Sequence, residues 1–240
     1  MSEGISTPLL FQPGEGWMYG AGIDAVGVLI ERVTGKDLEG YMRENIFDIL
    51  GMKATSFYVQ DKPEMKEKLV GVAMRKEDGT LGAIPAPNND TPIDASGGTG
   101  LYSSPDDFVK VLQDLLQDEP KVLSKEYADM LFSPLQLPEG SSTLKALRTQ
   151  LPLLFPTMDI IHKHVSINHS FAGLLWTGSD HFPQAEGVVM WYGALGTMWF
   201  VHREKGIAGY YESQLVPPGD VKNVEVMRAF LKVALAEIPA

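Results

Sequence analysis

The sequence has no cysteine among its 240 residues, which excludes disulfide bonds, thiolate metal sites and a cysteine nucleophile. Positive charge is also scarce, because 20 Lys and Arg stand against 31 Asp and Glu, a formal net charge of −11. A nucleic-acid-binding face needs a basic patch, so nucleic acid is not an expected partner. No apolar run is long enough to span a bilayer, and residues 1–4 do not begin a signal peptide. We therefore expect no membrane partner and a cytoplasmic location.

The stretch from Phe11 to Met52 is the best organised part of the sequence. Residues 12–16 are rich in Pro and Gly and predict a turn, and Tyr19 follows in another Gly-rich segment. From Ile23 the spacing of apolar residues predicts a buried helix that ends at Gly35. Asp24 and Glu31 fall on one face of this helix, and solvated charges are the expected interpretation of both. The tyrosine hydroxyl is thus expected in a tight loop just before a buried helix.

Other segments carry clear helix or strand signals. Asp78-Gly79 predicts a hairpin turn between two strands, Ser104 and Pro105 predict a helix start, and Asp220 predicts the cap of a terminal helix. Residues 133–184 show a weak pattern interrupted by prolines, and part of this region is interpreted as an excursion that covers substrate. The further predicted elements are helices over 38–46 and 121–131 and strands over 69–75, 81–84, 188–194, 197–202 and 207–214.

Three segments carry a resemblance to a known family: PGEGWMYGAGIDAVGVLIERVTG, SGGTGLYSSPDDFVKVLQDLL and MWYGALGTMWFVHREKGIAGYY. They resemble the serine β-lactamase-like superfamily, and are most similar to class C β-lactamases, related esterases and fungal acyltransferases of the lovastatin-synthesis type. The resemblance implies an α+β fold of the β-lactamase/transpeptidase-like type. Its antiparallel sheet would be flanked by helices beside a mainly helical region, with the N-terminal part of the fold missing. Residues 1–240 would form a single incomplete domain, mainly helical over 19–132, with sheet strands and the C-terminal helix over 186–240.

The resemblance also implies site residues. Tyr19 occupies the place of the family's Tyr-x-Asn or Tyr-x-Ser tyrosine, although Ala21 stands at the third position. Trp191-Tyr192-Gly193 fits the Trp-x-Gly form of the family's third motif, and the Ala194 backbone N–H would complete the oxyanion hole. Trp17 would contact substrate together with residues 191–193. The implied substrate is a small ester or thioester, handled through an acyl-enzyme without a metal or organic cofactor.

One part of this chemistry is absent from the sequence. The family needs a Ser nucleophile with a Lys one helical turn later, upstream of the tyrosine. Only 18 residues precede Tyr19, and they contain no Lys. The Ser-x-x-Lys at Ser142–Lys145 lies after Tyr19, in the wrong chain order. Two hypotheses follow: a serine hydrolase or acyltransferase that is inactive alone and needs a chain supplying the missing segment, or a non-catalytic fragment that binds an acyl ligand or a partner.

Other constellations have plainer interpretations. His162, His164 and His169 could bind a divalent metal, but no carboxylate stands at a matching spacing, so an exposed polar loop is the favoured interpretation. The Gly-rich residues 96–100 lack the Lys-Ser/Thr ending of a phosphate-binding loop. Tryptophans on strands and turns more often pack in a core than line a ligand pocket.

Overall fold

The computed structural model describes residues 8–86, 92–134, 137–154, 165–180 and 183–237. The chain divides into two compact units, and neither unit is continuous in sequence. The first contains Tyr19–Gly71 and Pro85–Val111, and the second contains Phe11–Met18, Val72–Ile84 and Leu112–Ala240.

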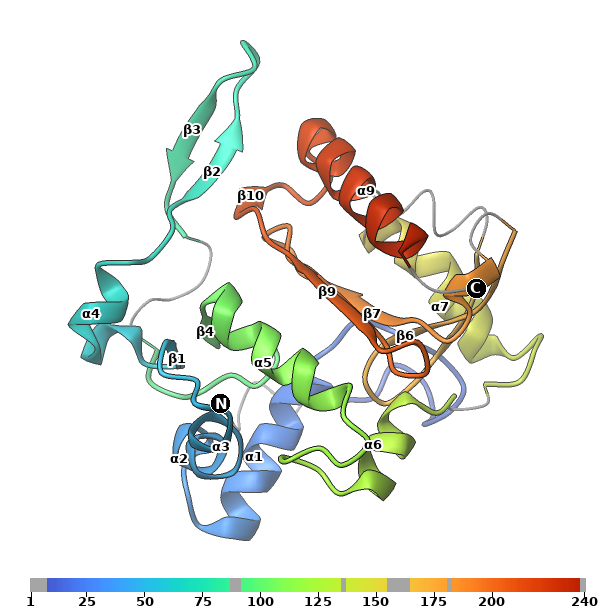
Figure 1. The fold of residues 1–240 in the computed structure, drawn as a ribbon, viewed down its shortest axis with the longest axis horizontal. Coiled ribbons are helices and arrows are strands. Elements are labelled where there is room, and N and C mark those ends of the chain that lie inside the picture. Colours follow the sequence, from blue (N-terminus) through green and yellow to red (C-terminus); the bar gives the residue numbers. More distant parts are fainter. Residues whose placement is uncertain (1–7, 87–91, 135–136, 155–164, 181–182, 238–240) are drawn as a thin grey trace. The chain divides into compact units, whose positions relative to one another are not determined.

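The first unit is mainly helical (Figure 1). Its short strands pair antiparallel, with Thr55 opposite Ser103. Its elements are α1 (Gly22–Thr34), α2 (Leu38–Met42), a π-helix (Arg43–Phe47), α3 (Asp48–Leu50), β1 (Thr55–Ser56), a 3₁₀ turn (Val59–Asp61), α4 (Pro63–Lys66), β4 (Tyr102–Ser103) and most of α5 (Pro105–Leu115).

Helix α1 forms where the sequence predicts it, but its predicted burial is wrong. Gly35 ends the helix with a φ of 70°. Val26, Leu29 and Val33 are 49%, 58% and 77% exposed, whereas Gly27 is buried. A Cβ at Gly27 would lie 3.0 Å from a methyl group of Leu38, so the helix packs through its smallest residue. Periodicity gives the apolar stripe but does not say what covers it.

A buried carboxylate holds the first unit together. Glu39, only 8% exposed, accepts hydrogen bonds from Ser56 Oγ at 2.8 Å, Phe57 N at 2.6 Å, Arg43 Nη2 at 2.7 Å and Lys62 Nζ at 2.9 Å. Burial alone would raise the pKa of Glu39, but the two cations and the two neutral donors hold this pKa below its ordinary value. One side chain thereby ties α2 to the chain after β1.

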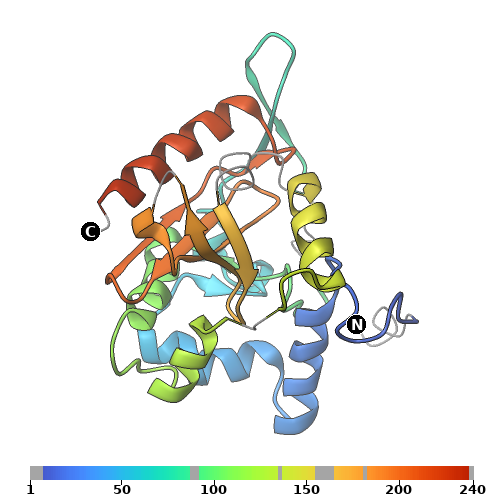
Figure 2. The same cartoon turned by 90° about the vertical axis from the view of Figure 1, so that its right-hand side faces the viewer.

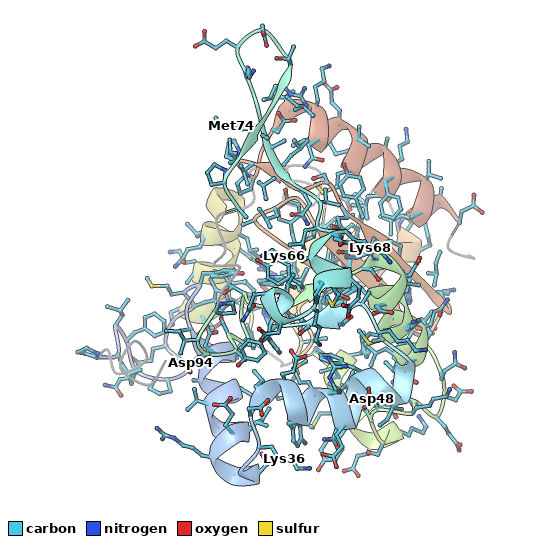
Figure 3. The ribbon with its side chains drawn as sticks, turned by 90° about the vertical axis from the view of Figure 1, so that its left-hand side faces the viewer. Lys36, Asp48, Lys66, Lys68, Met74 and Asp94 are labelled. Atoms are coloured by element: carbon cyan, nitrogen blue, oxygen red, sulfur yellow. The ribbon has the colours of Figure 1, made fainter. Side chains whose placement is uncertain are left out.

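The second unit is built on a five-stranded antiparallel sheet in the order β5-β6-β7-β8-β9. A smaller sheet, β10-β2-β3, carries a hairpin whose strand β2 bears Met74 (Figure 3). The elements are β2 (Val72–Arg75), β3 (Leu81–Ile84), α6 (Lys125–Phe132), α7 (Ser142–Leu154), β5 (Val165–His169), β6 (Leu174–Ser179), a 3₁₀ turn (Pro183–Ala185), β7 (Val189–Tyr192), β8 (Met198–His202), β9 (Ile207–Tyr211), β10 (Leu215–Val216) and α9 (Val221–Ala236).

Helices α7 and α9 cover one face of the large sheet (Figure 2). The face is formed by alternate strand residues such as Met190 and Phe200, which stand opposite each other on β7 and β8. Each fully buried side chain of this kind stabilises the fold by about 1.5–3 kcal/mol. The helix residues in this core are Leu144, Leu147, Leu151, Met227, Leu231 and Leu235.

Most predicted elements of the second unit are found, with two corrections. Helix α6 begins at Lys125 and not at Lys121, because Ser124 Oγ accepts a hydrogen bond from Tyr127 N and caps it there. The region 133–184 has a weak sequence pattern and was expected to be partly an excursion over the substrate. In the structure it contains the regular elements α7, β5 and β6. Among the helices of the described residues, none is long and apolar enough to cross a membrane.

Candidate functional site

The turn between β7 and β8 is the best defined part of the candidate site. Gly193 N donates to the Thr197 carbonyl oxygen at 2.7 Å, and Gly196 N donates to the Gly193 carbonyl oxygen at 3.0 Å. Gly196 has a φ of +78°, and a Cβ there would overlap the Ser213 hydroxyl, so only glycine fits. The sequence Gly-Ala-Leu-Gly therefore forms one tight turn.

Ala194 lies at the exposed tip of this turn. The carbonyl oxygen of the next residue, Leu195, accepts a hydrogen bond from Leu215 N at 3.1 Å. Within the described ranges, the Ala194 N–H has no hydrogen-bond acceptor. A rigid, exposed backbone N–H with no acceptor nearby is the type of group that stabilises a developing oxyanion.

The two aromatic residues before this turn face opposite sides of strand β7. Trp191 is partly buried, and its ring meets the ring of His169 edge to face, with 5.8 Å between centroids. Tyr192 is 2% exposed and belongs to the core beneath α7 and α9. Tyr192 therefore supports the strand from within the core, whereas Trp191 packs at the edge of this core and stays partly accessible.

Trp17 is held in the second unit by helix α7. Gln150 Nε2 donates to the Trp17 carbonyl oxygen at 2.8 Å, and the hydroxyls of Ser142 and Thr143 donate to the carbonyl oxygens of Glu15 and Gly14 at 2.6 and 2.5 Å. The Trp17 side chain packs against the same core as Trp191. These bonds fix the path of the chain just before Tyr19.

Tyr19 itself belongs to the first unit, and its side chain is 50% exposed. It lies three residues before α1. The structure thus places five of the six predicted site residues in the second unit and Tyr19 in the first.

A Gly-rich turn in the first unit is tied to the start of α1. Asp24 Oδ1 accepts hydrogen bonds from Ser96 Oγ at 2.5 Å and from Gly98 N at 3.1 Å. A Cβ at Gly97 would lie 3.0 Å from the Ile23 carbonyl oxygen, so the turn needs glycine to approach the helix. The expectation that Asp24 is only solvated is wrong, because its carboxylate binds groups 72 and 74 residues further along the chain, a contact without a local sequence signal.

Glu31 on the same helix is also engaged, because its Oε1 accepts a hydrogen bond from Leu38 N at 3.0 Å. This N–H is the first of α2, and such groups lack partners within their own helix. The predicted solvation of Glu31 is therefore wrong for the same reason as that of Asp24: each carboxylate meets backbone donors of a following segment.

The Ser-x-x-Lys at Ser142–Lys145 occupies the first turn of α7, where Ser141 Oγ accepts a hydrogen bond from Leu144 N at 3.2 Å and caps the helix. Ser142 and Lys145 share a helix face at this spacing. The Ser142 hydroxyl, however, donates its proton to the Glu15 carbonyl, so its hydrogen bond is not directed to Lys145. The geometry favours an anchoring role for Ser142.

The predicted histidine cluster falls only partly within the described residues. His162 and His164 lie outside them. His169 Nδ1–H donates to the Ser170 carbonyl oxygen at 2.5 Å, and burial lowers the pKa of His169 below its ordinary 6.5. Across the residues with described placement, no three His, Asp or Glu side chains are grouped so that they could hold a metal ion.

Comparison with protein families matches residues 4–232 to the family described as "Beta-lactamase". Acyltransferase calJ of Penicillium decumbens is 32% identical over 97% of this chain and 56% of its own length. Lovastatin esterase of Penicillium rubens is 32% identical over 92% of this chain and 56% of its own length. The chain thus spans about half the length of the curated relatives that it matches.

Solved structures are similar over nearly the whole chain. Simvastatin synthase of Aspergillus terreus, in the variant LovD6, superposes with a TM-score of 0.86 at 27% identity. The superposition covers 99% of this chain and 59% of that one. The unliganded synthase gives a TM-score of 0.81 at 25% identity, over 96% of this chain and 57% of its own.

Proposed function

Because the chain belongs to the Beta-lactamase family, we propose that it provides the tyrosine and oxyanion-hole part of a serine acyl-transfer site. The fold is β-lactamase/transpeptidase-like, as the sequence predicts, and the lineage is that of fungal esterases and acyltransferases. The substrate would be a small ester or thioester, converted through an acyl-enzyme. A cytoplasmic location fits such a role.

The observation that carries the proposal is the Gly193–Gly196 turn. Its exposed Ala194 N–H, with no acceptor among the described residues, follows directly on the Trp191-Tyr192-Gly193 strand. In the proposed reaction a serine Oγ attacks the ester carbonyl carbon, and the Ala194 N–H stabilises the resulting oxyanion. Tyr19 handles the serine proton and passes it to the departing alcohol or thiol. An acceptor alcohol or water then removes the acyl group from the serine.

The attacking serine would come from a polypeptide segment other than residues 1–240. No Ser-x-x-Lys precedes Tyr19, and Ser142 is engaged with Glu15. The exposed apolar face of α1 begins close to Tyr19 and includes Val26, Leu29 and Val33. We propose that the segment supplying the Ser-Lys pair packs on this face, which would bury it and bring the pair within reach of the Tyr19 hydroxyl.

The relatives suggest the size of the acyl group. Their names include a lovastatin esterase and a methylbutanoyltransferase from Penicillium citrinum, so short branched acyl esters are the natural probes. The partly buried indole rings of Trp17 and Trp191 offer apolar walls for such a group. Aromatic side chains of this kind provide much contact area at little conformational cost.

A second candidate is a non-catalytic fragment that binds an acyl ligand or a partner. The missing Ser-x-x-Lys upstream of Tyr19 favours it, because nothing else in the candidate site can form the acyl-enzyme. The two candidates differ in one respect: only the first predicts catalysis once a Ser-Lys pair is present.

The test is to assay hydrolysis of the p-nitrophenyl ester of 2-methylbutanoic acid by two preparations. The first is the purified chain alone. The second is the chain co-expressed with the part of acyltransferase calJ that does not align with it. We expect no hydrolysis and no covalent fluorophosphonate adduct with the chain alone, and both with the complex. Tyr19→Phe should lower the rate of the complex by about 10²–10⁴-fold. Tyr127→Phe, at another exposed tyrosine, is the matched control.

A complex that forms but remains inactive would support the non-catalytic candidate. A stoichiometric adduct on the chain alone, mapped to Ser142, would overturn the assignment of an external nucleophile.

A further inference from the structure

Thr197 follows the Gly193–Gly196 turn and leads the chain into β8. A Cβ added to Gly193 would lie 2.3 Å from Thr197 Oγ1 but 3.7 Å from Thr197 Cβ, so the threonine hydroxyl points toward Gly193. The Thr197 carbonyl oxygen accepts the hydrogen bond from Gly193 N at 2.7 Å, which fixes the two residues opposite each other. The missing side chain of Gly193 therefore leaves the room that the Thr197 hydroxyl occupies.

The Thr197 hydroxyl is not used by the fold. Among the residues whose placement is described, none forms a hydrogen bond with Thr197 Oγ1, and this atom is not one of the polar atoms sealed from solvent. The residue as a whole is partly buried. Polar groups inside proteins are normally paired with other protein groups. In the described part of the chain, nothing competes with a ligand for this hydroxyl.

The Thr197 hydroxyl lies near the Ala194 N–H, the proposed oxyanion donor. A carbon–carbon single bond is about 1.5 Å long, so Thr197 Oγ1 is within about 3.8 Å of Gly193 Cα. The Ala194 nitrogen is two bonds beyond that Cα, which limits the separation of the two donors to about 6.7 Å. Two donors without acceptors in the described chain are thus neighbours on one tight turn.

A single ester group fits two donors at this separation. Its carbonyl oxygen and its bridging oxygen are bonded to the same carbon, and each can accept a hydrogen bond of about 2.5–3.2 Å. The Ala194 N–H binds the carbonyl oxygen in the proposed function, which leaves the bridging oxygen for Thr197. A thioester has sulfur at the bridging position, and sulfur is a weak acceptor. The threonine hydroxyl therefore distinguishes oxygen esters from thioesters.

We propose that Thr197 is a substrate-binding residue whose hydroxyl donates a hydrogen bond to the bridging oxygen of an oxygen ester, so that the site prefers oxygen esters to thioesters. This inference rests on the proposed function for the position of the carbonyl oxygen. During acyl transfer the bond from the serine Oγ to the carbonyl carbon forms, and the bond from that carbon to the bridging oxygen breaks. The departing oxygen takes the proton that Tyr19 passes on. Thr197 keeps its own proton and stabilises the negative charge that develops on the departing oxygen.

The first test measures binding to the chain alone, which requires no nucleophile. Methyl 2-methylbutanoate and the corresponding S-methyl thioester are titrated into isotope-labelled chain, and the NMR signal of the Ala194 backbone amide reports occupancy. We expect the oxygen ester to bind about 2–10-fold more tightly, which is the range that one neutral hydrogen bond supplies. Thr197→Val replaces the hydroxyl with a methyl group and should abolish the preference. Thr197→Ser keeps the hydroxyl and should retain it.

Thr177→Val is the matched control, because Thr177 is an exposed threonine on strand β6 of the same unit. It should leave both affinities unchanged. Circular dichroism would verify that all three variants are folded. Equal affinities of the unchanged chain for the two ligands, or a preference that persists in Thr197→Val, would overturn the proposal. An Ala194 signal that neither ligand shifts up to the limit of solubility would overturn it as well.

A second test uses the complex with the calJ segment and separates this inference from the proposed function. The ratio of kcat/KM for the phenyl ester of 2-methylbutanoic acid to that for its thiophenyl ester should fall about 2–10-fold in Thr197→Val. An unchanged ratio in an active complex would contradict the role of Thr197 while leaving the proposed function intact. An inactive complex would count against the proposed function, and the binding preference of the chain alone would still decide the role of Thr197.

Discussion

Arg75 and Asp220 lie 145 residues apart in sequence and form a two-pronged ion pair. Arg75 Nε donates to Asp220 Oδ2 at 2.8 Å, and Nη2 donates to Oδ1 at 3.0 Å. Asp220 Oδ1 also accepts a hydrogen bond from Asn223 N at 2.8 Å and so caps α9. One carboxylate thus fixes strand β2 to the start of the last helix. The Arg75 guanidinium holds the pKa of Asp220 below its ordinary value.

Asp220→Ala should destabilise the second unit, because it removes both the cap and the ion pair. Loss of the cap alone costs about 1 kcal/mol. Asp220→Asn keeps an acceptor for Asn223 N and should be milder. Urea unfolding followed by circular dichroism measures both, and equal stability of the two variants would show that the cap contributes little.

Replacing Glu39 should be far more costly than replacing Glu44. Glu39→Ala leaves the buried donors of Ser56 and Phe57 without their acceptor and should cost about 2–4 kcal/mol. Glu44 forms an exposed ion pair with Lys36, so Glu44→Ala should change stability by less than about 1 kcal/mol. Thermal unfolding of the two variants provides the comparison. A small effect at both sites would contradict the clamping role of Glu39.

Asp24 should protect the Gly-rich turn from opening. Asp24→Ala removes the acceptor for Ser96 Oγ and Gly98 N. If this lowers the free energy of opening the turn by about 1.4 kcal/mol, local hydrogen exchange becomes about tenfold faster. Asp24→Asn retains one acceptor oxygen and should have a smaller effect. Hydrogen–deuterium exchange of residues 96–101 measures this directly. Unchanged exchange in Asp24→Ala would show that backbone bonds alone hold the turn.

The stability of the second unit should fall as the pH drops below 6.5. Burial holds the pKa of His202 and of His169 below the ordinary 6.5. Around His202, the carbonyls of Gln184 and Glu186 and the charge of Glu204 favour the protonated form, and Lys205 opposes it. In this pH range the unfolded chain binds protons that the folded chain does not, so the unfolding free energy rises with pH and is fully present above 6.5.

Urea unfolding at several pH values between about 5 and 8 tests this expectation. The lowered pKa of Asp220 adds a loss of stability of this unit only at more acid pH, below the ordinary range of carboxylates. His202→Leu should flatten the dependence in the upper part of the range, because a leucine cannot take up a proton. If the unfolding free energy of His202→Leu depends on pH as strongly as that of the unchanged chain, then protonation of His202 does not cause the dependence.

Sequence patterns predicted the elements whose ends carry their own local signals. Ser104, Asp220 and Gly79 act through their own backbone or that of the next few residues, so the α5 and α9 starts and the β2–β3 turn were found. The π-helix over Arg43–Phe47 has no such signal, because an extra residue in a helical turn depends on the packing around it.

Helix α7 was missed although Leu144, Leu147 and Leu151 follow a helical spacing. Prolines on both sides of it made the whole region resemble a loop. The site residues were predicted from the resemblance to a known family. The Gly193–Gly196 turn also follows from its glycines. The hydrogen bonds of Asp24 and Ser142, however, join segments far apart in sequence. Such contacts leave no periodic pattern in the chain.

The anchoring of Trp17 by Gln150 has a consequence for synthesis on the ribosome. These two residues are separated by 133 positions. At roughly 5–20 residues per second, Trp17 would emerge roughly 7–27 s before its partner helix is made. During that interval the Trp17 side chain has no core to enter, and the second unit can close only when helix α9 has been made. The nascent chain therefore has a defined period in which a chaperone that binds aromatic segments could bind around Trp17.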